Sequence, residues 1–549
     1  MESQRLILFF VFSFSLFLLV DAWQRDQQPQ PQRAASEATA KKDPTIPPPP
    51  SEKLTGALPP TATQAPAAGL ATGPSVTVET DIYRAEISTA GGDLRRLELK
   101  QHRDTEDPQR NFVLFDQRPD HLYVSQAGLL GELPNHRTQY SAQAPRYALG
   151  DGAATLEVRL EAPPVKGVKV AKIYRFHRGT YVIDVAFEIT NEGAAPIQPY
   201  GYFQLLRDGK EPGGSSAMLP TFTGVGVYTS KEKFVKLTFS DIEKAKTSSP
   251  KTSDDGWIAV LQHYFLGAWL PKNGTPREFY TRQVEGLYAA GVIVPAPPVQ
   301  PGASVVLEVP LYAGPQEQDK LAKLAPGLDL SIDYGWLTII AVPLFWVLSW
   351  LYRWVGNWGV AIILLTVIIK LLFYPLSEAS YRSMARMRVL APKLQRLKEQ
   401  YGSDKQRMQA AMMDLYKTEK INPLGGCLPI VVQIPVFIAL YWVLLASVEL
   451  RQAPFMLWIQ DLSRSDPYFV LPVLMGATMI IQTRLSPEPP DPVQAKVMKI
   501  MPVAFSVFFF FFPAGLVLYW LINNILSILQ QWHINRVLDR ANLAPGRKS

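Results

Sequence analysis

The chain contains one cysteine, Cys427, which excludes an internal disulfide and any CxxC metal or redox site. Common enzyme signatures are also missing: there is no HExxH, no GxSxG, no P-loop and no GxGxxG motif. The six histidines are scattered along the chain. We therefore expect a protein that is not an enzyme and that has no catalytic residues, no metal ligands and no cofactor.

Acidic residues are absent from the long apolar runs that dominate the sequence after about residue 334. Lys370 lies inside one such run, residues 358–376, and no Asp or Glu lies in another run of that length. A charge at that depth costs at least about 3 kcal/mol, so it should have a function and a partner. The sequence offers no acidic partner, which leaves water, lipid phosphate or a passing polypeptide. The alternative is that Lys370 merely snorkels to the headgroups.

The first half of the chain is polar and strand-like. Residues 6–23 form either a removable signal peptide or an uncleaved anchor, and residues 24–74 have the Pro-rich composition of a tether. From residue 75 to about 315 apolar side chains alternate with polar ones, as in Leu156, Val158 and Leu160. This pattern predicts an antiparallel sandwich of about 240 residues. A short closing helix is expected at residues 316–324.

Charge bias sets the expected membrane topology. Residues 377–426 carry ten Lys or Arg against five acids, and short loops with that bias stay in the cytoplasm. Residues 336–352 must then lie flat on the membrane if the sandwich is outside, and residues 513–515 must form a turn. The first run must be retained as an anchor. The net charge of +7 gathers near the membrane ends, which suits anionic lipid or ribosomal RNA and not sequence-specific nucleic acid.

The expected layout is as follows. It comprises an N-terminal anchor (1–23), a periplasmic linker (24–74), a periplasmic β domain with its closing helix (75–333), an interfacial amphipathic helix (334–357), spans at 358–376, 427–448, 468–483, 497–512 and 516–534, a cytoplasmic helical hairpin (377–426), a periplasmic loop (449–467), a cytoplasmic loop (484–496) and a basic cytoplasmic tail (535–549).

Two groups of side chains are candidate functional sites. Several polar residues lie in the predicted spans and are expected to converge with Lys370 on one hydrated recess, although each singly suits interhelical packing: Thr366, Gln433, Ser506, Asn523 and Asn524. The hairpin contains methionine-rich apolar faces that either pack its two helices together or receive varied hydrophobic segments: Met384, Met387, Met408 and Met412. Ser403 and Gln406 predict a capping box for its second helix.

Four segments resemble the YidC family of bacterial inner-membrane protein insertases. They are residues 367–376 (VIIKLLFYPL), 422–427 (NPLGGC), 448–455 (VELRQAPF) and 512–519 (FPAGLVLY). The resemblance covers nearly the whole chain. It implies a helical insertase core of five spans plus an N-terminal anchor, joined to a large periplasmic antiparallel β super-sandwich.

The resemblance also implies a mechanism and partners. A groove open to the cytoplasm and to lipid would contain Lys370, Gln433 and Trp520, with Thr366 and Trp520 touching a passing client. The implied partners are nascent membrane proteins, membrane lipid, the Sec translocon and translating ribosomes. The family commonly has Arg where this chain has Lys370, which keeps the charge but loses the forked geometry that binds a carboxylate with two hydrogen bonds.

Two other functions fit parts of the sequence. A small-molecule or ion transporter could use Lys370 as its binding charge, but such proteins usually show internal repeats and paired ionisable residues, and neither is visible. The sandwich could be a sugar-binding or mutarotase-like module, because the family's periplasmic domain resembles that fold. Mutarotase chemistry requires histidines and acids that converge in a cleft.

Overall fold

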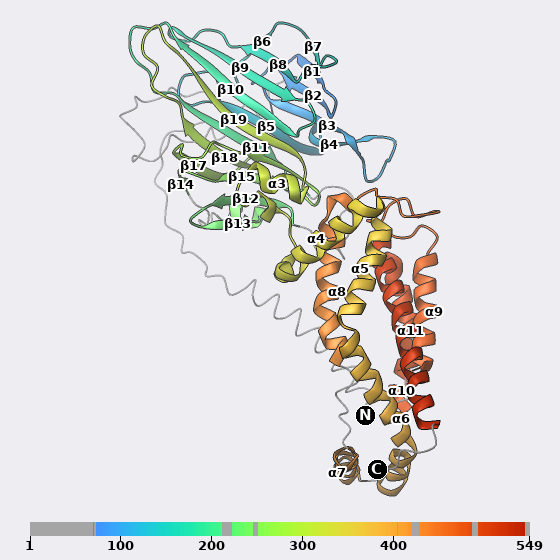
Figure 1. Ribbon diagram of the computed structural model, residues 1–549. Coiled ribbons are helices and arrows are strands. Elements are labelled where there is room, and N and C mark those ends of the chain that lie inside the picture. Colours follow the sequence, from blue (N-terminus) through green and yellow to red (C-terminus); the bar gives the residue numbers. More distant parts are fainter. Residues whose placement is uncertain are drawn as a thin grey trace. The chain divides into compact units, whose positions relative to one another are not determined.

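The computed structural model describes residues 70, 73–210, 222–244, 251–402, 404–419, 428–485 and 492–543. The chain forms two compact units, one built of strands and one of helices (Figure 1). They separate between Asp333 and Tyr334, where the sequence changes from strand-like to apolar. The predicted anchor and nearly all of the linker lie outside the described residues.

The strand unit is a sandwich of two large sheets. In the described residues, a ten-stranded sheet has the order β14-β17-β18-β11-β5-β4-β3-β2-β1-β7, and a nine-stranded sheet has the order β13-β12-β15-β16-β19-β10-β9-β8-β6. Their neighbouring strands are antiparallel except for β1 and β7. The predicted β-sandwich is confirmed, and the closing helix is α3.

The bounds of the elements of this unit follow. The first sheet contains β1 (Ser75–Glu79), β2 (Tyr83–Ser88), β3 (Leu94–Arg103), β4 (Asn111–Arg118), β5 (His121–Leu129), β7 (Arg146–Ala148), β11 (Tyr200–Arg207), β14 (Thr252–Ser253), β17 (Arg277–Val284) and β18 (Leu287–Pro295). The second contains β6 (Ser141–Ala142), β8 (Thr155–Glu161), β9 (Val168–His177), β10 (Val182–Asn191), β12 (Gly224–Thr229), β13 (Lys233–Leu237), β15 (Trp257–Leu261), β16 (Phe265–Trp269) and β19 (Ser304–Pro315). The short helices are α2 (Phe239–Glu243), α3 (Gln318–Leu324) and η2 (Leu328–Ser331).

Alternating side chains build the sandwich core. On β8, Val158 and Leu160 are fully buried while Glu157 is exposed, and the apolar positions of β10 are likewise buried. Because successive side chains of a strand point to opposite faces, this alternation places one face of each strand against the other sheet. The predicted in-and-out pattern is confirmed.

A buried ion pair ties the two sheets together. Lys172 on β9 donates hydrogen bonds to the backbone oxygens of Gly91 (3.1 Å) and Ala127 (2.9 Å), and its Nζ lies 3.9 Å from a carboxylate oxygen of Asp93. Burial raises the pKa of Asp93 to about 6, although Lys172 and Arg95 act in the opposite direction. Because removing two charges from water costs free energy that their attraction only partly offsets, this pair is weak evidence for added stability.

The helical unit runs from Tyr334 almost to the end of the chain. Its elements are η3 (Gly335–Leu337), α4 (Thr338–Val355), α5 (Trp358–Leu372), α6 (Tyr374–Tyr401), α7 (Lys405–Thr418), α8 (Leu428–Ala446), η5 (Val448–Leu450), α9 (Val470–Leu485), α10 (Pro492–Phe508), η6 (Phe509–Phe511) and α11 (Ala514–Leu543). The break between η6 and α11 contains Pro513, at the predicted turn. Helix α10 begins before residue 497, and α11 continues beyond residue 534, whereas the bounds of the membrane spans themselves stay predictions.

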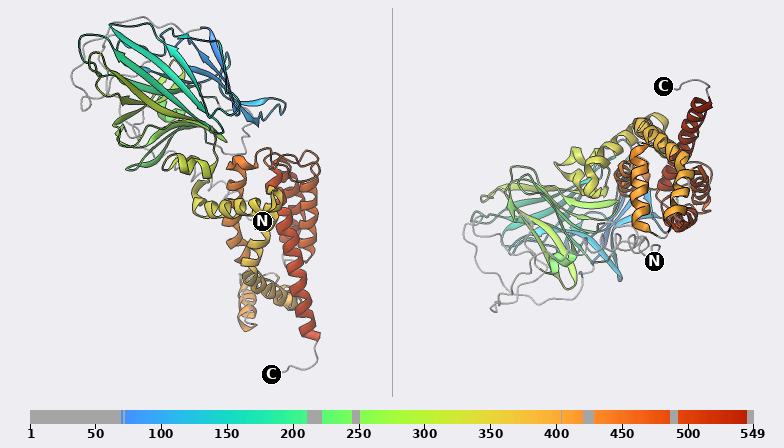
Figure 2. Two further views of the ribbon diagram at one scale, coloured as in Figure 1. Left: turned by 45° about the horizontal axis from the view of Figure 1, so that its top comes forward. Right: turned by 90° about the horizontal axis from the view of Figure 1, so that it is seen from below.

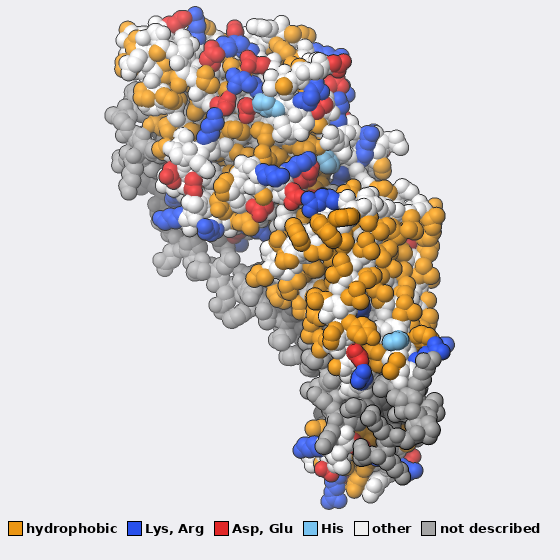
Figure 3. Space-filling model, in the orientation of Figure 1, with side chains coloured by type: hydrophobic (Ala, Val, Ile, Leu, Met, Phe, Trp, Pro, Cys, Tyr) orange, Lys and Arg blue, Asp and Glu red, His pale blue; other side chains and the backbone are white. Residues whose placement is uncertain are grey.

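Few of the described helices in this unit are both long enough and apolar enough to cross a membrane. Among the described residues, Gly335–Val355 is the one continuous helical stretch that is long and apolar enough to cross a membrane, and α5 with the start of α6 passes the same test as a bent pair. Two shorter apolar helices are Val432–Ala446 and Val470–Leu485. On the face seen in Figure 3, hydrophobic side chains cover the upper part of the helical unit.

Helix α4 lies across the direction of the other helices of its unit (Figure 2). Ala341, Phe345 and Leu348 are buried, whereas a row of large apolar side chains is exposed, comprising Trp336, Ile339, Trp346, Trp350 and Trp354. Gly356, with a φ of 66°, ends the helix in a left-handed conformation that favours glycine. The helix therefore presents a tryptophan-rich apolar face to its surroundings.

Because the sandwich has its own hydrophobic core, we expect it to fold without the helical unit. Residues 73–333, expressed alone, should fold cooperatively, because a chain of this length buries its own apolar core. If the chain inserts membrane proteins, as the resemblance implies, a variant that lacks most of this domain but keeps the segment before Trp336 should retain most of its insertion activity. Circular dichroism melting of the domain and a client insertion assay measure the two outcomes. Loss of all insertion by a stably expressed deletion would show that the sandwich takes part in the chemistry.

Candidate functional site

The helix that carries Lys370 is shorter than the sequence suggested. The apolar run at residues 358–376 is not one continuous helix: α5 ends at Leu372, α6 begins at Tyr374, and the two helices are bent by 62°. Pro375 explains the break, because it has no N–H to donate to the preceding turn and its ring obstructs a continuous helix. Lys370 thus lies in the last turn of α5, where the helix dipole favours a cation.

The chain supplies a polar partner for Lys370, contrary to the expectation from sequence. Lys370 Nζ donates a hydrogen bond to Ser527 Oγ on α11 at 2.7 Å. The hydroxyl of Ser527 in turn donates to the backbone oxygen of Asn523 at 2.7 Å. The distribution of acidic residues in the sequence gives no sign of this contact, because the partner is a neutral hydroxyl. The lysine is therefore held in place without being neutralised.

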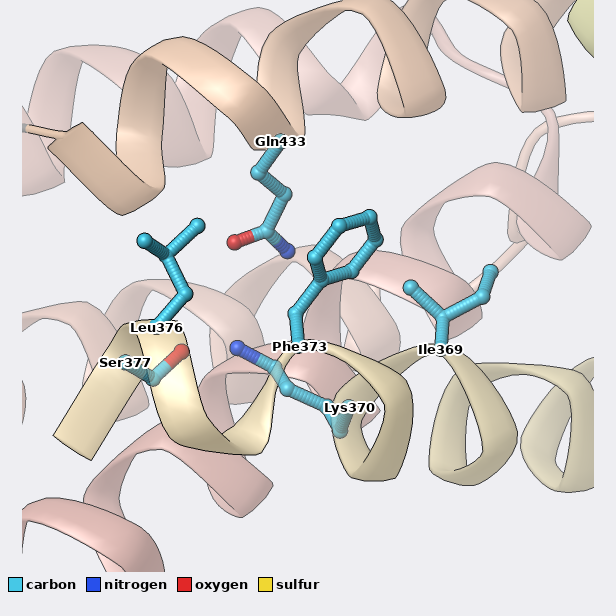
Figure 4. Close-up of a pocket in the computed structure, with 6 residues that line it drawn as sticks. All are labelled: Ile369, Lys370, Phe373, Leu376, Ser377 and Gln433. Atoms are coloured by element: carbon cyan, nitrogen blue, oxygen red, sulfur yellow. The ribbon is translucent and has the colours of Figure 1, made fainter.

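A small recess opens beside this lysine. It encloses about 270 Å³ including its open mouth, and its lining residues are Ile369, Lys370, Phe373, Leu376, Ser377 and Gln433. The Lys370 amine and the Gln433 amide point toward each other across it (Figure 4). Gln433 on α8 also donates a hydrogen bond to Asn523 Oδ1 at 2.5 Å. Three helices, α5, α8 and α11, thus bring polar groups to one place.

Thr366 and Trp520 lie close by in the bundle but outside the lining of this recess. Thr366 is 1% exposed, and its hydroxyl donates to the backbone oxygen of Ile362 in its own helix. Trp520 packs edge-on against Phe437, with ring centroids 4.5 Å apart, and lies 5.5 Å from the ring of Phe509. In this conformation Thr366 is covered, whereas Trp520 belongs to an aromatic cluster between α8, η6 and α11.

Two other polar residues do not join the recess, so the expected convergence is wrong for them. Ser506 on α10 donates to the backbone oxygen of Pro472 on α9 at 2.8 Å. The Asn524 amide reaches Thr478 Oγ1 on α9 at 3.4 Å. Both connect neighbouring helices, which satisfies polar groups inside an apolar bundle.

The hairpin consists of α6 and α7, which pack together. Lys393 on α6 forms an ion pair of 2.6 Å with Glu419 just after α7. Met408 and Met412 are half-buried on α7, whereas the side chains of Met384 and Met387 are outside the described part of the chain. These positions fit the packing interpretation for the two methionines of α7 and leave part of their surface accessible.

The predicted cap of α7 is wrong. Asp404, and not Ser403, is the residue whose side chain accepts hydrogen bonds from the backbone N–H groups at the start of the helix, those of Gln406 and Arg407. Asp is among the strongest N-caps, and it stands one position later than the predicted serine. Ser403 itself lies outside the described residues.

Comparison with known proteins identifies the family. The family model of the YidC periplasmic domain matches residues 75–347, and the model of the 60Kd inner membrane protein matches residues 350–541. A membrane protein insertase YidC from Nitrosospira multiformis is 55% identical over 570 residues, covering 100% of both chains. Another from Methylobacillus flagellatus is 56% identical over 546 residues, covering 98% of each. The chain belongs to the YidC family.

The YidC resemblance of the four quoted segments is thereby confirmed. A solved structure of an active YidC insertase, with its first transmembrane domain resolved, aligns with 84% of this chain and 92% of its own at 18% identity and a TM-score of 0.39. The family comprises inner-membrane proteins with a periplasmic domain, and it is not a class of catalytic enzymes.

Sequence reasoning missed Ser527, although a signal for it exists. Asn523, Ser527 and Gln531 recur every four residues in α11, which places these polar side chains along one stripe of the helix. Asn523 accepts a hydrogen bond from Gln433 and Ser527 accepts one from Lys370, whereas Gln531 donates to the backbone oxygen of Leu485. The helical spacing of these polar residues predicts a common stripe, whereas only the packing of α11 shows which of them reach Lys370.

Proposed function

We propose that this YidC-family protein inserts membrane proteins by offering the Lys370 cation and the polar recess to the hydrophilic tail of a client. The observation that carries the proposal is the bond from Lys370 Nζ to Ser527 Oγ, a neutral partner. Among the described residues no carboxylate forms an ion pair with Lys370. Its positive charge therefore remains available to an acidic group that enters the recess.

The free energy for insertion comes from the client. A polar tail that crosses an apolar layer loses its hydration, and a recess that supplies water and a cation lowers that cost. The hydrophobic segment then partitions into lipid beside the recess helices, which contributes about 0.8 kcal/mol for each buried CH₂ group. This route needs no nucleotide and no metal ion.

Lysine at position 370 is better suited to attracting acidic groups in general than to selecting a carboxylate of one particular geometry. Its ammonium is a compact charge on a flexible stem, whereas arginine would present a planar fork that binds a carboxylate with two hydrogen bonds. One ammonium N–H is directed at Ser527. The remaining N–H groups can meet acidic tails of varied geometry, which suits a protein with many clients.

The hairpin is the proposed receiving surface on the cytoplasmic side. Met408 and Met412 are half-buried, and Met413 is 49% exposed, so α7 presents flexible apolar side chains at its surface. Methionine adapts to partners of different shape. We assign the same role to Met384 and Met387 on α6. The basic character of residues 377–426 suits ribosomal RNA and anionic lipid, and the Sec translocon and translating ribosomes complete the proposed set of partners.

The topology is proposed from charge and from α4. Its exposed tryptophans suit the membrane interface, where aromatic rings meet both apolar and polar surroundings. With α4 flat on the periplasmic side, the hairpin and the C-terminus are cytoplasmic and the sandwich is periplasmic. Thr366 and Trp520 remain proposed client contacts, and Thr366 requires a rearrangement that uncovers it.

The alternative functions have less support. In the described part of the sandwich, His121 pairs with Asp208 and His177 with Asp184, and the two histidines lie on strands of different sheets. Mutarotase chemistry requires such groups to converge in one cleft. A transporter using Lys370 would need a second ionisable group nearby, and the described lining of the recess contains none besides Lys370.

Topology reporters test the proposed orientation. Reporters placed after Ser549 and near Gly402 should give a cytoplasmic signal, because basic segments stay inside. One inserted at Gly152, in an exposed turn of the sandwich with open space around it, should give a periplasmic signal. A periplasmic signal at Gly402 would mean that α4 crosses the membrane.

Substitutions of Lys370 test the charge itself. Lys370→Arg should be tolerated, and Lys370→Ala should lower insertion of an acidic-tailed client about tenfold or more, since a charge-assisted hydrogen bond contributes about 1.5–3 kcal/mol. Lys370→Glu should be worse because like charges repel. Insertion is measured for otherwise identical clients with acidic, neutral and basic tails at matched insertase levels.

The comparison between tails separates three outcomes. A charge mechanism requires the Lys370→Ala defect to shrink as acidic residues are removed from the tail. Equal defects for all tails would assign Lys370 to hydrating the recess. An unimpaired Lys370→Ala protein would leave snorkelling as the role of this lysine.

A further inference from the structure

The hydroxyl of Ser527 is a hydrogen-bonding node between helices α5 and α11. It accepts a hydrogen bond from Lys370 on α5 at 2.7 Å and donates one to the backbone oxygen of Asn523 on α11 at 2.7 Å. A serine hydroxyl has one donor and two acceptor positions, so it can serve as donor and acceptor in these two contacts at once. Ser527 is 4% exposed, which shields the node.

We infer that Ser527 is the positioning residue that directs the Lys370 ammonium into the recess, and that its neutrality makes the site selective for acidic tails. This inference rests on the proposed role of Lys370 as the attracting charge. Lysine has a long, flexible side chain, and a fixed partner restricts the directions in which it can point. Ser527 provides that restriction from a separate helix.

The chemical identity of the partner matters because an acidic side chain at this position would have a different effect. A carboxylate beside Lys370 would form an ion pair and cancel the local positive charge. Incoming acidic tails would then compete with a permanent internal anion. A hydroxyl satisfies one N–H of the ammonium and leaves the net charge unchanged. The hydroxyl of Ser527 therefore sets both the direction in which the Lys370 ammonium points and the strength with which it attracts an acidic tail.

Ser506 offers a matched control. It is also a serine in the helical unit whose hydroxyl donates to a backbone oxygen, that of Pro472 on the neighbouring helix α9, at 2.8 Å. It lies on α10 and does not line the recess. If serine-to-alanine changes act only by loosening the bundle, then Ser506→Ala and Ser527→Ala should have the same effect on every client.

The test measures insertion of one client with an acidic or a neutral tail by the full-length insertase in membranes. Ser527→Ala should lower insertion of the acidic-tailed client about two- to tenfold, as expected for one lost hydrogen bond. Ser527→Thr, which keeps the hydroxyl, should restore activity to within about twofold of the parent. Ser527→Asp should remove the advantage of the acidic tail as fully as Lys370→Ala does. Ser506→Ala should change the insertion of the acidic-tailed and the neutral-tailed client by the same factor.

A double-mutant cycle separates positioning from general stability. Once Lys370 is replaced by alanine, Ser527→Ala should cause no further loss, because nothing remains to be positioned. An equal loss from Ser527→Ala with and without Lys370, or an equal loss for both tails, would overturn the inference. If Lys370→Ala lowers acidic-tail insertion but the Ser527 variants do not, this inference alone fails. If the effect of Lys370→Ala does not depend on the tail, both this inference and the proposed charge mechanism fail.

Discussion

For its proposed role, Lys370 must be held inside an apolar helical bundle without losing its charge, and its contacts meet that requirement. Its Nζ donates to the hydroxyl of Ser527, and the last turn of α5 directs its backbone carbonyls toward the same end of the helix. Gln433 and Asn523 bond to each other nearby, so their amides are partly satisfied before any client arrives. In the proposed mechanism these polar groups are therefore stable in the bundle and can still bind an acidic client tail.

The bend after α5 gives this lysine its place. Pro375 ends the straight helix at Leu372, and the following helix departs at 62°. Phe373 and Leu376 flank the break and line the recess together with Lys370. A straight helix through this segment would extend Phe373 and Leu376 along the axis of α5. Because Pro375 bends the chain here, these two residues line the recess beside Lys370.

Much of the fold could be predicted from sequence because it depends on local periodicity. The alternation in β8 and β10 and the change of composition near residue 334 are properties of neighbouring residues, and both correspond to observed features. The importance of Lys370 followed from the cost of a charge in an apolar run. Its partner could not be predicted in the same way, because Ser527 is 157 residues away and hydroxyls are common in helices. The burial of Thr366 likewise depends on how whole helices pack.

Crosslinking from two positions near Lys370 tests the central claim most directly. Leu376 lines the recess, whereas Leu371 is next to Lys370 in sequence, is 66% exposed and is not part of the lining. A photoreactive residue at each position is combined with a stalled client that carries an acidic tail. The account predicts that the tail crosslinks to position 376 and much less to position 371, and that Lys370→Ala weakens the first product. Equal crosslinking from both positions, or none from position 376, would contradict it.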